Sequence, residues 1–441
     1  MKKSIVYAAV AVLALAGCAK VTVFDKADKD AVAFGAYSGR TIVKAGSTED
    51  ITLDNLKSIG FGVFATYSGV DDFSAATDDF MYNQQVSFTD PDWTYSPIKY
   101  WPNPTNGQSA DAQKVSFFAY APYCDPEDAA ADNSYGITGF KVEGGHDIVE
   151  YKFASNKPNV DLLWGYKTKS TTQPYTYTVN ENLTRTTDKV SFIFQHMLSK
   201  LAGSQDGDPA TVGANGLIIK TSPTVDPTNG FGVDNGTKIT VSEIVVKSAD
   251  TDLNGDPIVY AADDETIDGQ LDLYTGEFTV TGTVKNIKFE QTVSADAAAV
   301  AAGASELADD LKEVASPASF AAVNPGVKKE AVNVYKDEND PLILIPGTTP
   351  VVDVTITYVV RTYDEKLGTK QYSEVPQTVY GKVAFPTIEK NKKYNLLIIV
   401  GLNDAKFEAT VEDWTIGRTD VNGDGVVDEK DDINVWLPEN L

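Results

Sequence analysis

Short runs in which β-branched and aromatic residues alternate with polar residues recur along most of the chain. Alternation is typical of strands that bury one face, and helical periodicity is nearly absent. Turn-forming pairs lie near or between the runs: Asn106-Gly107, Gly144-Gly145, Asn235-Gly236 and Asn254-Gly255. Many short strands with such turns predict an all-β chain built of β-sandwiches. The expected strands lie within Gly60–Ser68, Lys114–Tyr120, Asp161–Gly165, Lys189–Phe194, Lys238–Val246, Gly276–Val284, Val352–Arg361 and Lys393–Gly401.

One stretch departs from this pattern. Residues Ala295–Ala322 are rich in alanine, the best helix former, and Leu307 and Leu311 are four residues apart. This spacing predicts a short helix near Ser305–Val314, as a surface insertion between strands of a second sandwich. The alternative for this stretch is a flexible loop.

The chain has 441 residues, a length that suggests two or three domains. The polar stretch Thr184–Asp188 marks the expected internal boundary. It divides the chain into an N-terminal sandwich over residues 41–188 and a C-terminal sandwich over residues 189–419, both within the usual size of a domain.

Residues 1–17 have the features of a secretory signal. Lys2 and Lys3 are followed by the apolar run Ile5–Ala16, which is too short to span a bilayer as a stable helix. The run ends in Leu-Ala-Gly before Cys18, which resembles the bacterial lipobox. The resemblance implies that the thiol of Cys18 is acylated and that the exported chain is tethered to a membrane surface. The alternative is an ordinary signal peptide followed by a chance cysteine.

The charge of the chain argues against two kinds of partner. The formal net charge is −26, and removing Lys2 and Lys3 with the signal takes it to −28 (−26 − 2). Nucleic-acid binding needs clustered Lys and Arg, and an anionic membrane repels an acidic chain. We therefore expect no nucleic-acid partner, and attachment to the membrane through the lipid alone.

Motifs of catalysis are absent from the sequence. It contains no GxSxG nucleophile motif, no zinc-binding helix and no phosphate-binding glycine loop. His146 and His196 lie far apart, outside any spacing typical of a zinc site. If Cys18 is lipidated, Cys124 is the remaining cysteine, so no intrachain disulfide can form. We expect a protein that is not an enzyme.

An acidic loop after the expected second sandwich carries the strongest chemical signal. Residues 420–431 place side-chain oxygens at positions 1, 3, 5, 9 and 12 of a loop, with Gly425 at the sharp turn of position 6. Calcium takes roughly six to eight oxygen ligands, and this spacing wraps them around one point. The expected calcium ligands are Asp420, Asn422, Asp424, the carbonyl of Val426, Asp428 and Asp431.

This loop resembles the EF-hand and departs from it at Asp431, where the EF-hand has Glu and dockerin-type calcium loops also have Asp. Because a single loop is present, a dockerin that binds cohesin is not expected. The alternative is a plain acidic turn. A second acidic string, Asp252–Asp256, has Pro257 at the turn position and is expected to form a hairpin turn.

Five groups of residues follow one another along the mature chain. They are the lipobox; AVAFGAYSGR followed by GFGVFATYSG; the pair YSPIKYWP and KVSFFAYAPY; KVSFIFQHMLSKL; and KKYNLLIIVGLN with VEDWTIG. In this order they resemble the fimbrillin family of Bacteroidetes, the subunits of type V pili. The resemblance extends over nearly the whole mature chain, up to Gly417.

The resemblance implies two transthyretin-like β-sandwiches in tandem and assembly by strand exchange. A lipidated precursor would reach the outer membrane, and a trypsin-like protease would cut it after a basic residue. The first strand would then leave, and the exposed groove would accept a donor strand from another subunit. Main-chain hydrogen bonds give such strand addition its affinity, and pockets for alternate side chains set its register.

Arg40 is the cleavage point that the resemblance implies, so residues 18–40 would form a removable propeptide strand. The polar stretch Lys44–Asp54 follows, and a protease could reach such a region. The alternatives are a surface arginine in an ordinary first strand, and Lys29 or Lys44 as rival sites. The strand before Arg40 alternates as one buried face requires, with Val32, Phe34 and Ala36 on one side and Ala33, Gly35 and Tyr37 on the other.

The tail beyond the acidic loop is the expected donor strand, because Ile433, Val435 and Leu437 share one face at strand spacing. Calcium in the loop would make the hinge to this strand rigid, so residues 420–441 would form a calcium-loop and tail extension. The alternatives are a tail that packs on its own domain, and a tip subunit whose tail donates nothing.

We therefore expect a structural subunit of a cell-surface fimbrium that can also be adhesive. Its partners would be other fimbrial subunits, in a homo- or hetero-polymer, the processing protease and a host or bacterial surface receptor. The precursor would be a surface-exposed lipoprotein of the outer membrane. The alternative function is a monomeric surface lipoprotein that binds glycans or host proteins through exposed aromatics, unless these are core aromatics: Tyr95, Tyr100 and Trp101.

Overall fold

The described part of the chain is nearly all β-structure, which confirms the predicted fold class, and each of the eight predicted runs contains or overlaps a strand. The short helices of this part are α3 (Leu53–Ile59), α4 (Ala297–Ala301) and a 3-10 turn (Phe320–Ala322). The computed structural model describes residues 31–37, 53–77, 79–103, 112–128, 136–154, 160–170, 175–185, 188–201, 216–221, 236–262, 265–281, 285–336 and 342–413.

The first large sheet closes on itself. A further pairing of β8 with β5 joins the two ends of a path that runs from β5 through β1 to β8, so these strands form a ring. Buried apolar side chains fill the inside of the ring. The order of strands is β11 (Asn180–Leu183), β5 (Lys114–Ala121), β2 (Phe61–Gly69), β3 (Met81–Thr89), β4 (Asp92–Thr94), β1 (Phe34–Tyr37), β12 (Val190–His196) and β8 (Leu163–Tyr166).

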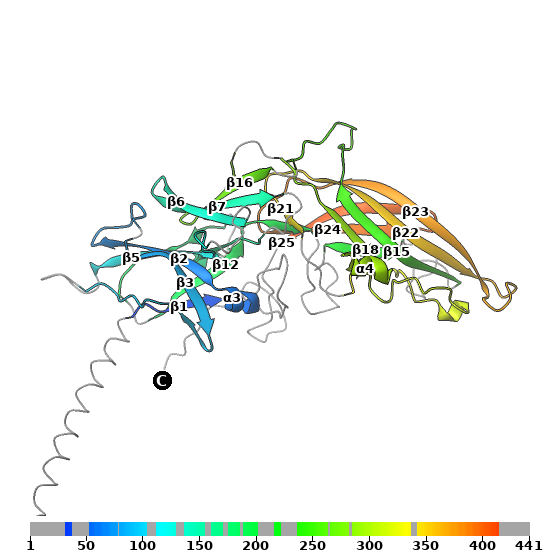
Figure 1. Cartoon of the computed structure of the whole chain (residues 1–441), viewed down its shortest axis with the longest axis horizontal. Helices are drawn as coiled ribbons and strands as arrows, with labels where there is room; N and C mark the ends of the chain where they lie inside the picture. Colours follow the sequence, from blue (N-terminus) through cyan, green and yellow to red (C-terminus); the bar gives the residue numbers. More distant parts are fainter. Residues whose placement is uncertain are drawn as a thin grey trace, which may run out of the picture.

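A second, smaller sheet covers one side of the ring (Figure 1). Phe64 and Tyr120 of the ring pack in one buried cluster with Val149, Phe153 and Leu271 of this sheet. A two-stranded hairpin of β9 (Thr168–Lys169) and β10 (Tyr177–Thr178) lies outside both sheets. The order of strands in the smaller sheet is β17 (Phe278–Val280), β16 (Thr266–Asp272), β7 (His146–Ala154) and β6 (Gly136–Glu143).

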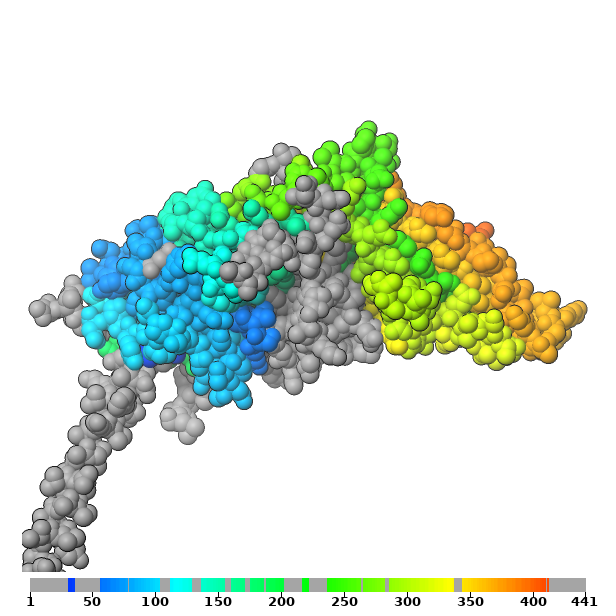
Figure 2. Space-filling model, viewed as in Figure 1, coloured from blue at the N-terminus to red at the C-terminus, as the bar shows by residue number. Residues whose placement is uncertain are grey.

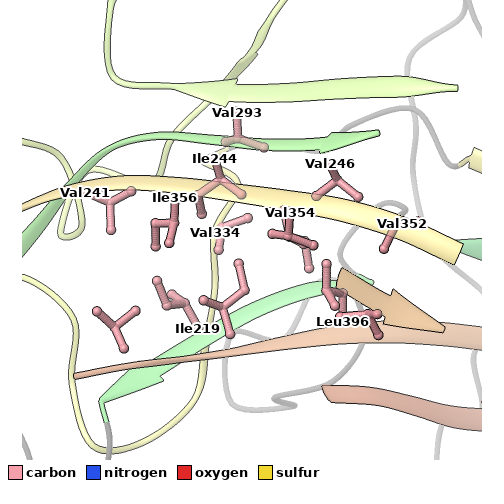
Figure 3. Close-up of a cluster of buried hydrophobic side chains, with 14 of the residues drawn as sticks. Ile219, Val241, Ile244, Val246, Val293, Val334, Val352, Val354, Ile356 and Leu396 are labelled. Carbon is pink, nitrogen blue, oxygen red and sulfur yellow. The ribbon is translucent and has the colours of Figure 1, made fainter. Parts of the chain in front are cut away.

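Two further sheets form a sandwich at the other end of the elongated molecule (Figures 1 and 2). Figure 3 shows the core between them, where Ile244 and Ile356 of one sheet face Ile219 and Leu396 of the other. One sheet contains β19 (Ser305–Glu306), β18 (Glu290–Ser294), β15 (Thr237–Ser248), β22 (Val351–Tyr363) and β23 (Tyr372–Ala384). The other contains β20 (Val332–Asn333), β14 (Leu217–Thr221), β24 (Lys392–Val400), β13 (Ser199–Leu201), β21 (Leu342–Leu344) and, beside β24, β25 (Ala405–Asp413).

The helix predicted near Ser305–Val314 is wrong. This segment begins with β19, which pairs in parallel with β18, and α4 lies earlier in the alanine-rich stretch. Leu307 and Leu311 are 0% and 1% exposed and belong to the core of the second sandwich. Their spacing therefore reflects the packing of an irregular segment onto a sheet, because tertiary burial overrides the helix propensity of alanine.

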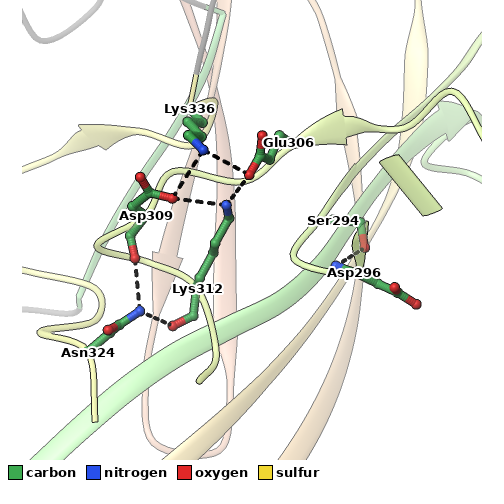
Figure 4. A network of polar contacts seen from close by, with 7 residues as sticks. All are labelled: Ser294, Asp296, Glu306, Asp309, Lys312, Asn324 and Lys336. Carbon is green, nitrogen blue, oxygen red and sulfur yellow. Dashed lines mark hydrogen bonds and ion pairs between the residues drawn. The ribbon is translucent and has the colours of Figure 1, made fainter. Parts of the chain in front are cut away.

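Polar contacts hold this irregular segment on the surface (Figure 4). Lys312 forms ion pairs with Glu306 and, at 2.9 Å, with Asp309, while Lys336 lies 3.1 Å from Glu306. The hydrogen bonds from Lys312 hold the pKa values of both carboxylates below their ordinary range. The Asn324 amide donates to the carbonyl oxygens of Asp309 and Lys312, each at 2.9 Å. The two hydrogen bonds from Asn324 satisfy backbone carbonyls that a helix would have paired internally.

Strands from both sides of the expected domain boundary pair with one another. β12, which begins just after Asp188, pairs with β1 and β8, and β16 pairs with β7. The division into sandwiches over residues 41–188 and 189–419 stays a prediction.

The turn between β16 and β17 joins the ring to the second sandwich. The indole N–H of Trp164 in β8 donates a hydrogen bond of 2.8 Å to the carbonyl of Leu273. Gly276 has φ of +67°, and a Cβ built there would come within 2.4 Å of the Trp164 ring. From the segment before β24, the ammonium of Lys390 donates to the carbonyl of Gly276 at 2.7 Å, and burial lowers its pKa.

We expect Gly276→Ala to lower the free energy of unfolding by about 2–4 kcal/mol, because the added Cβ meets Trp164 and a non-glycine residue is strained at this φ. Gly255→Ala is the matched control, since Gly255 has φ of +89° with no atom within 4 Å of a built Cβ. It should cost about 1 kcal/mol. Urea unfolding followed by tryptophan fluorescence measures both, and equal losses would contradict the packing argument.

Candidate functional site

Strand β1 occupies a place between β4 and β12 in the ring. It pairs in parallel with β12 from Phe34 opposite Val190 to Tyr37 opposite Ile193. On its other side it pairs with β4 at Phe34 opposite Trp93 alone. The preceding residues add contacts, since Val32 N donates to Lys99 O at 2.9 Å and Val190 N donates to Ala33 O at 2.8 Å.

The side chain of Phe34 fills an aromatic pocket inside the ring. Four rings lie around it, with centroid distances of 5.1 Å to Tyr95, 6.0 Å to Phe117, 6.3 Å to Phe192 and 6.5 Å to Phe61. Three of the four meet Phe34 edge to face, which is a favourable geometry for aromatic pairs. Phe34 is 1% exposed, so it is a core residue although it lies near the start of the described chain.

Tyr95, directly after β4, attaches the start of the strand to the ring. Its hydroxyl proton is shared between Val32 O at 2.9 Å and the more distant Lys99 O at 3.3 Å, and its oxygen accepts a hydrogen bond from Lys99 N at 3.1 Å. Burial raises the pKa of Tyr95, so the hydroxyl stays protonated at neutral pH. The pKa of Tyr95 is higher in the folded than in the unfolded chain. The protonated hydroxyl therefore stabilises the fold fully below the unfolded pKa of about 10, and this stabilisation is lost as the pH rises through the folded pKa.

The buried face predicted for this strand is present at two of its three positions. Val32 and Phe34 are 2% and 1% exposed, and the side chain of Ala36 lies outside what is described. Gly35, on the opposite face, is also buried. In the ring, β1 is the strand that joins the edge of β4 to the edge of β12.

A buried hydrogen-bonded pair of side chains holds the far end of β12. His196 is the last residue of β12, and its Nδ1 lies 2.7 Å from Oδ2 of Asp161, with side-chain exposures of 2% and 0%. Asp161 precedes β8, which pairs with β12 from Ile193 to His196. The wall of the groove on this side is therefore anchored independently of β1, which pairs with the first half of β12.

The other predicted site residues lie outside the described residues. These are the lipidation site Cys18, the cleavage point Arg40 with its rivals Lys29 and Lys44, the calcium ligands of residues 420–431, and the donor residues Ile433, Val435 and Leu437. They stay predictions.

Two of the three aromatics proposed for glycan binding are core residues. Tyr95 and Trp101 are 9% and 2% exposed, whereas Tyr100 is 48% exposed. The core interpretation is thus confirmed for Tyr95 and Trp101, and both belong to the cluster that also buries Val32 and Phe34.

The acidic string Asp252–Asp256 forms the expected hairpin turn. The carboxylate of Asp252 accepts hydrogen bonds from Asp256 N at 2.9 Å and Asn254 N at 2.8 Å, which lower its pKa. Thr251 and Pro257 form an antiparallel bridge across the turn. Within the described ranges, no three His, Cys, Asp or Glu side chains are grouped so that they could hold a metal ion. No helix in these ranges is long and apolar enough to cross a bilayer.

The described part of the chain is nearly all β-structure, and its first strand, β1, completes a closed ring of strands and fills an aromatic pocket inside it. Residues 51–414 match the family model described as fimbrillin-like, and the chain belongs to this family.

Two relatives can be compared in detail. The chain is 26% identical to the fimbrium subunit Fim1C of Phocaeicola vulgatus, over 96% of this chain and 97% of that protein. Its fold is similar to the crystal structure of a fimbrial protein from Bacteroides vulgatus, with a TM-score of 0.54 and 19% identity, covering 87% of this chain and 99% of that one.

The sequence assigns no role to the pocket residues Phe61, Phe117 and Phe192, and it singles out Tyr95 for glycan binding and not for this pocket. Three of them lie within expected strands, so their burial was foreseeable, but their convergence on Phe34 depends on pairings between distant segments. The hydroxyl contact of Tyr95 has no sequence signal at all.

Phe34→Ala in the uncut chain should lower the free energy of unfolding by about 3–5 kcal/mol, because it leaves a cavity among four rings. Tyr100→Ala is the control, since that ring is largely exposed, and its loss should cost less than about 1 kcal/mol. Chemical denaturation compares the two variants with the parent. If Phe34→Ala is no worse than Tyr100→Ala, β1 is not part of the core.

Proposed function

We propose that this chain is a structural subunit of a cell-surface fimbrium, assembled by removal of β1 and insertion of a donor strand from another subunit. The observation that carries the proposal is the position of β1 inside the ring, between β4 and β12. Membership of the fimbrillin-like family and the similarity to a fimbrium subunit support it. The exchange would restore the pairing that the loss of β1 removes, so the ring of the cut subunit would be complete again only in the polymer.

The contacts of β1 explain why the strand needs a protease to be released. Exposing Val32 and Phe34 would each cost roughly 1.5–3 kcal/mol, and each main-chain hydrogen bond adds about 0.5–1.5 kcal/mol. While the peptide chain is continuous, a strand that opens is held close to its groove and returns. Once the chain is cut, a strand that opens can dissociate from the subunit. A donor strand can then take the place of β1.

Arg40 is the proposed cleavage point, three residues after Tyr37 at the end of β1. A cut there would separate β1 and, with it, the lipid proposed at Cys18 from the rest of the subunit. The precursor would then be a lipoprotein of the outer membrane, and the mature subunit would be held in the fimbrium by its neighbours.

Limited trypsin treatment of the exported full chain, mixed with the other subunits of its fimbrium, should produce oligomers in size exclusion, and Arg40→Ala should abolish them. Arg185→Ala is the matched control, because Arg185 follows β11, a strand that does not pair with β1, and its loss should leave the oligomers unchanged. N-terminal sequencing of the product distinguishes a start at Thr41 from cuts at Lys29 or Lys44. Monomers with a start at Thr41 would contradict strand exchange.

The calcium loop is a second part of the proposal. Residues 420–431 would bind one Ca²⁺ through their carboxylate, amide and carbonyl oxygens and make the connection to the tail rigid. The tail, with Ile433, Val435 and Leu437 on one face, would act as a donor strand.

Calorimetric titration of the full chain with Ca²⁺ should show one site, which Asp424→Asn weakens at least about tenfold by removing a charged ligand. Asp256→Asn is the control, because Asp256 lies in the hairpin turn, and it should leave the titration unchanged. Chelation should also make the tail more sensitive to protease. Absence of a binding isotherm would mean that the loop is a plain acidic turn.

The alternative, a monomeric lipoprotein that binds glycans or host proteins, now rests on Tyr100 alone among the three aromatics first considered. A chain that stays monomeric after cleavage and binds glycans would favour it.

A further inference from the structure

Strand β1 presents a distinct pattern of side-chain sizes to its groove. Val32 and Phe34 point into the core and are 2% and 1% exposed. The residues that alternate with them, Ala33 and Gly35, are small. Ala33 is half-buried and Gly35 is buried. Read from Val32, the pattern is apolar, small, aromatic, small.

The place of Phe34 is shaped for an aromatic ring. The four surrounding rings come from different segments, and two of them belong to strands β5 and β12, which remain when β1 leaves. Protein interiors are close-packed, so a smaller aliphatic side chain in this pocket would leave a void.

The opposite face of β1 has no room for a large side chain at Gly35. Gly35 lies opposite Ser191 of β12 and is buried without a side chain of its own. A large residue at this position would have to displace the atoms that cover it, which close packing makes unfavourable.

The tail of this chain does not have the pattern that the groove requires. Suppose that two of the three aligned aliphatic residues of the tail occupy the buried places of Val32 and Phe34. An aliphatic residue then takes the place of Phe34 in every register and in both strand directions. The same registers put Asn434 or Trp436 in the place of Ala33. The aligned residues are Ile433, Val435 and Leu437.

A register that places Trp436 in the aromatic pocket does not fit the groove either. It puts Asn434 or Pro438 at the buried place of Val32, depending on the direction of the strand. Burying an amide without partners is unfavourable, and proline cannot donate the hydrogen bond that Val32 N makes to Lys99 O.

We infer that the groove under β1 accepts a strand from a different kind of subunit, one with the pattern apolar, small, aromatic, small. The chain thus joins an unlike neighbour at this groove and does not polymerise with copies of itself by inserting its own tail. This inference rests on the proposed strand exchange and specifies its partner.

Labelled synthetic peptides test the inference on the full chain cut after Arg40. The probes are the peptide of residues 31–37, the same peptide with Phe34→Leu, the same peptide with Gly35→Trp, and the tail peptide of residues 432–441. Each is added in excess, and fluorescence anisotropy follows its incorporation as the original strand is displaced. The uncut Arg40→Ala chain is the control and should take up none of them.

The peptide of residues 31–37 should bind at least about tenfold more tightly than the two substituted peptides and the tail peptide. Binding of the tail peptide as tight as that of the first peptide would overturn the inference while leaving strand exchange intact. Equal binding of the Phe34→Leu peptide would overturn the requirement for an aromatic residue. Failure of all four peptides, including the chain's own first strand, would overturn strand exchange and the inference together.

Discussion

The packing of Phe34 among four aromatic rings is the contact on which the first part of the molecule depends. Those rings come from β2, from the residue after β4, from β5 and from β12, so one side chain connects segments that lie far apart in the sequence. The closed path of strands also runs through β1. The strand that the proposed assembly removes is therefore part of the core, and its removal changes both the packing and the main-chain pairing of the ring.

A sheet edge with unpaired main-chain groups is a site of aggregation, and this molecule protects its edges in two ways. In the described residues, β23 is the last strand of its sheet, and it carries the exposed residues Glu374 and Pro376. A charge and a residue without an N–H hinder another strand from adding there. The edges of β4 and β12 that face each other are covered by β1. In the proposed assembly this second protection is removable, as a subunit that must later accept a partner requires.

The sequence predicts local features of this fold well and contacts between distant segments poorly. Strands such as β2, β15 and β22 follow from runs of β-branched and aromatic residues, whose alternation is a property of neighbours in the chain. The helix expected near Ser305–Val314 failed because Leu307 and Leu311 are buried by the sheet above them, and propensity is weaker than such burial. The burial of Val32 and Phe34 was predicted from their spacing. The four rings around Phe34 could not be predicted, since their meeting depends on the parallel pairing of β1 with β12 and on the order of strands in the ring.

The short pairing of β1 also bears on the direction of the proposed exchange. Its register with β12 covers four residues and that with β4 covers one, so side-chain burial contributes much of its affinity. In the continuous chain the strand acts at an effective concentration of the order of millimolar, and this advantage disappears once it is cut and diffuses away. A donor strand joined to a neighbouring subunit in a growing polymer keeps that advantage. The donor then needs to match the pocket around Phe34, and it does not need stronger contacts than β1 for the exchange to proceed. A lipid anchor at Cys18 would remain with the released strand and hold it at the membrane while the subunit leaves with its new partner.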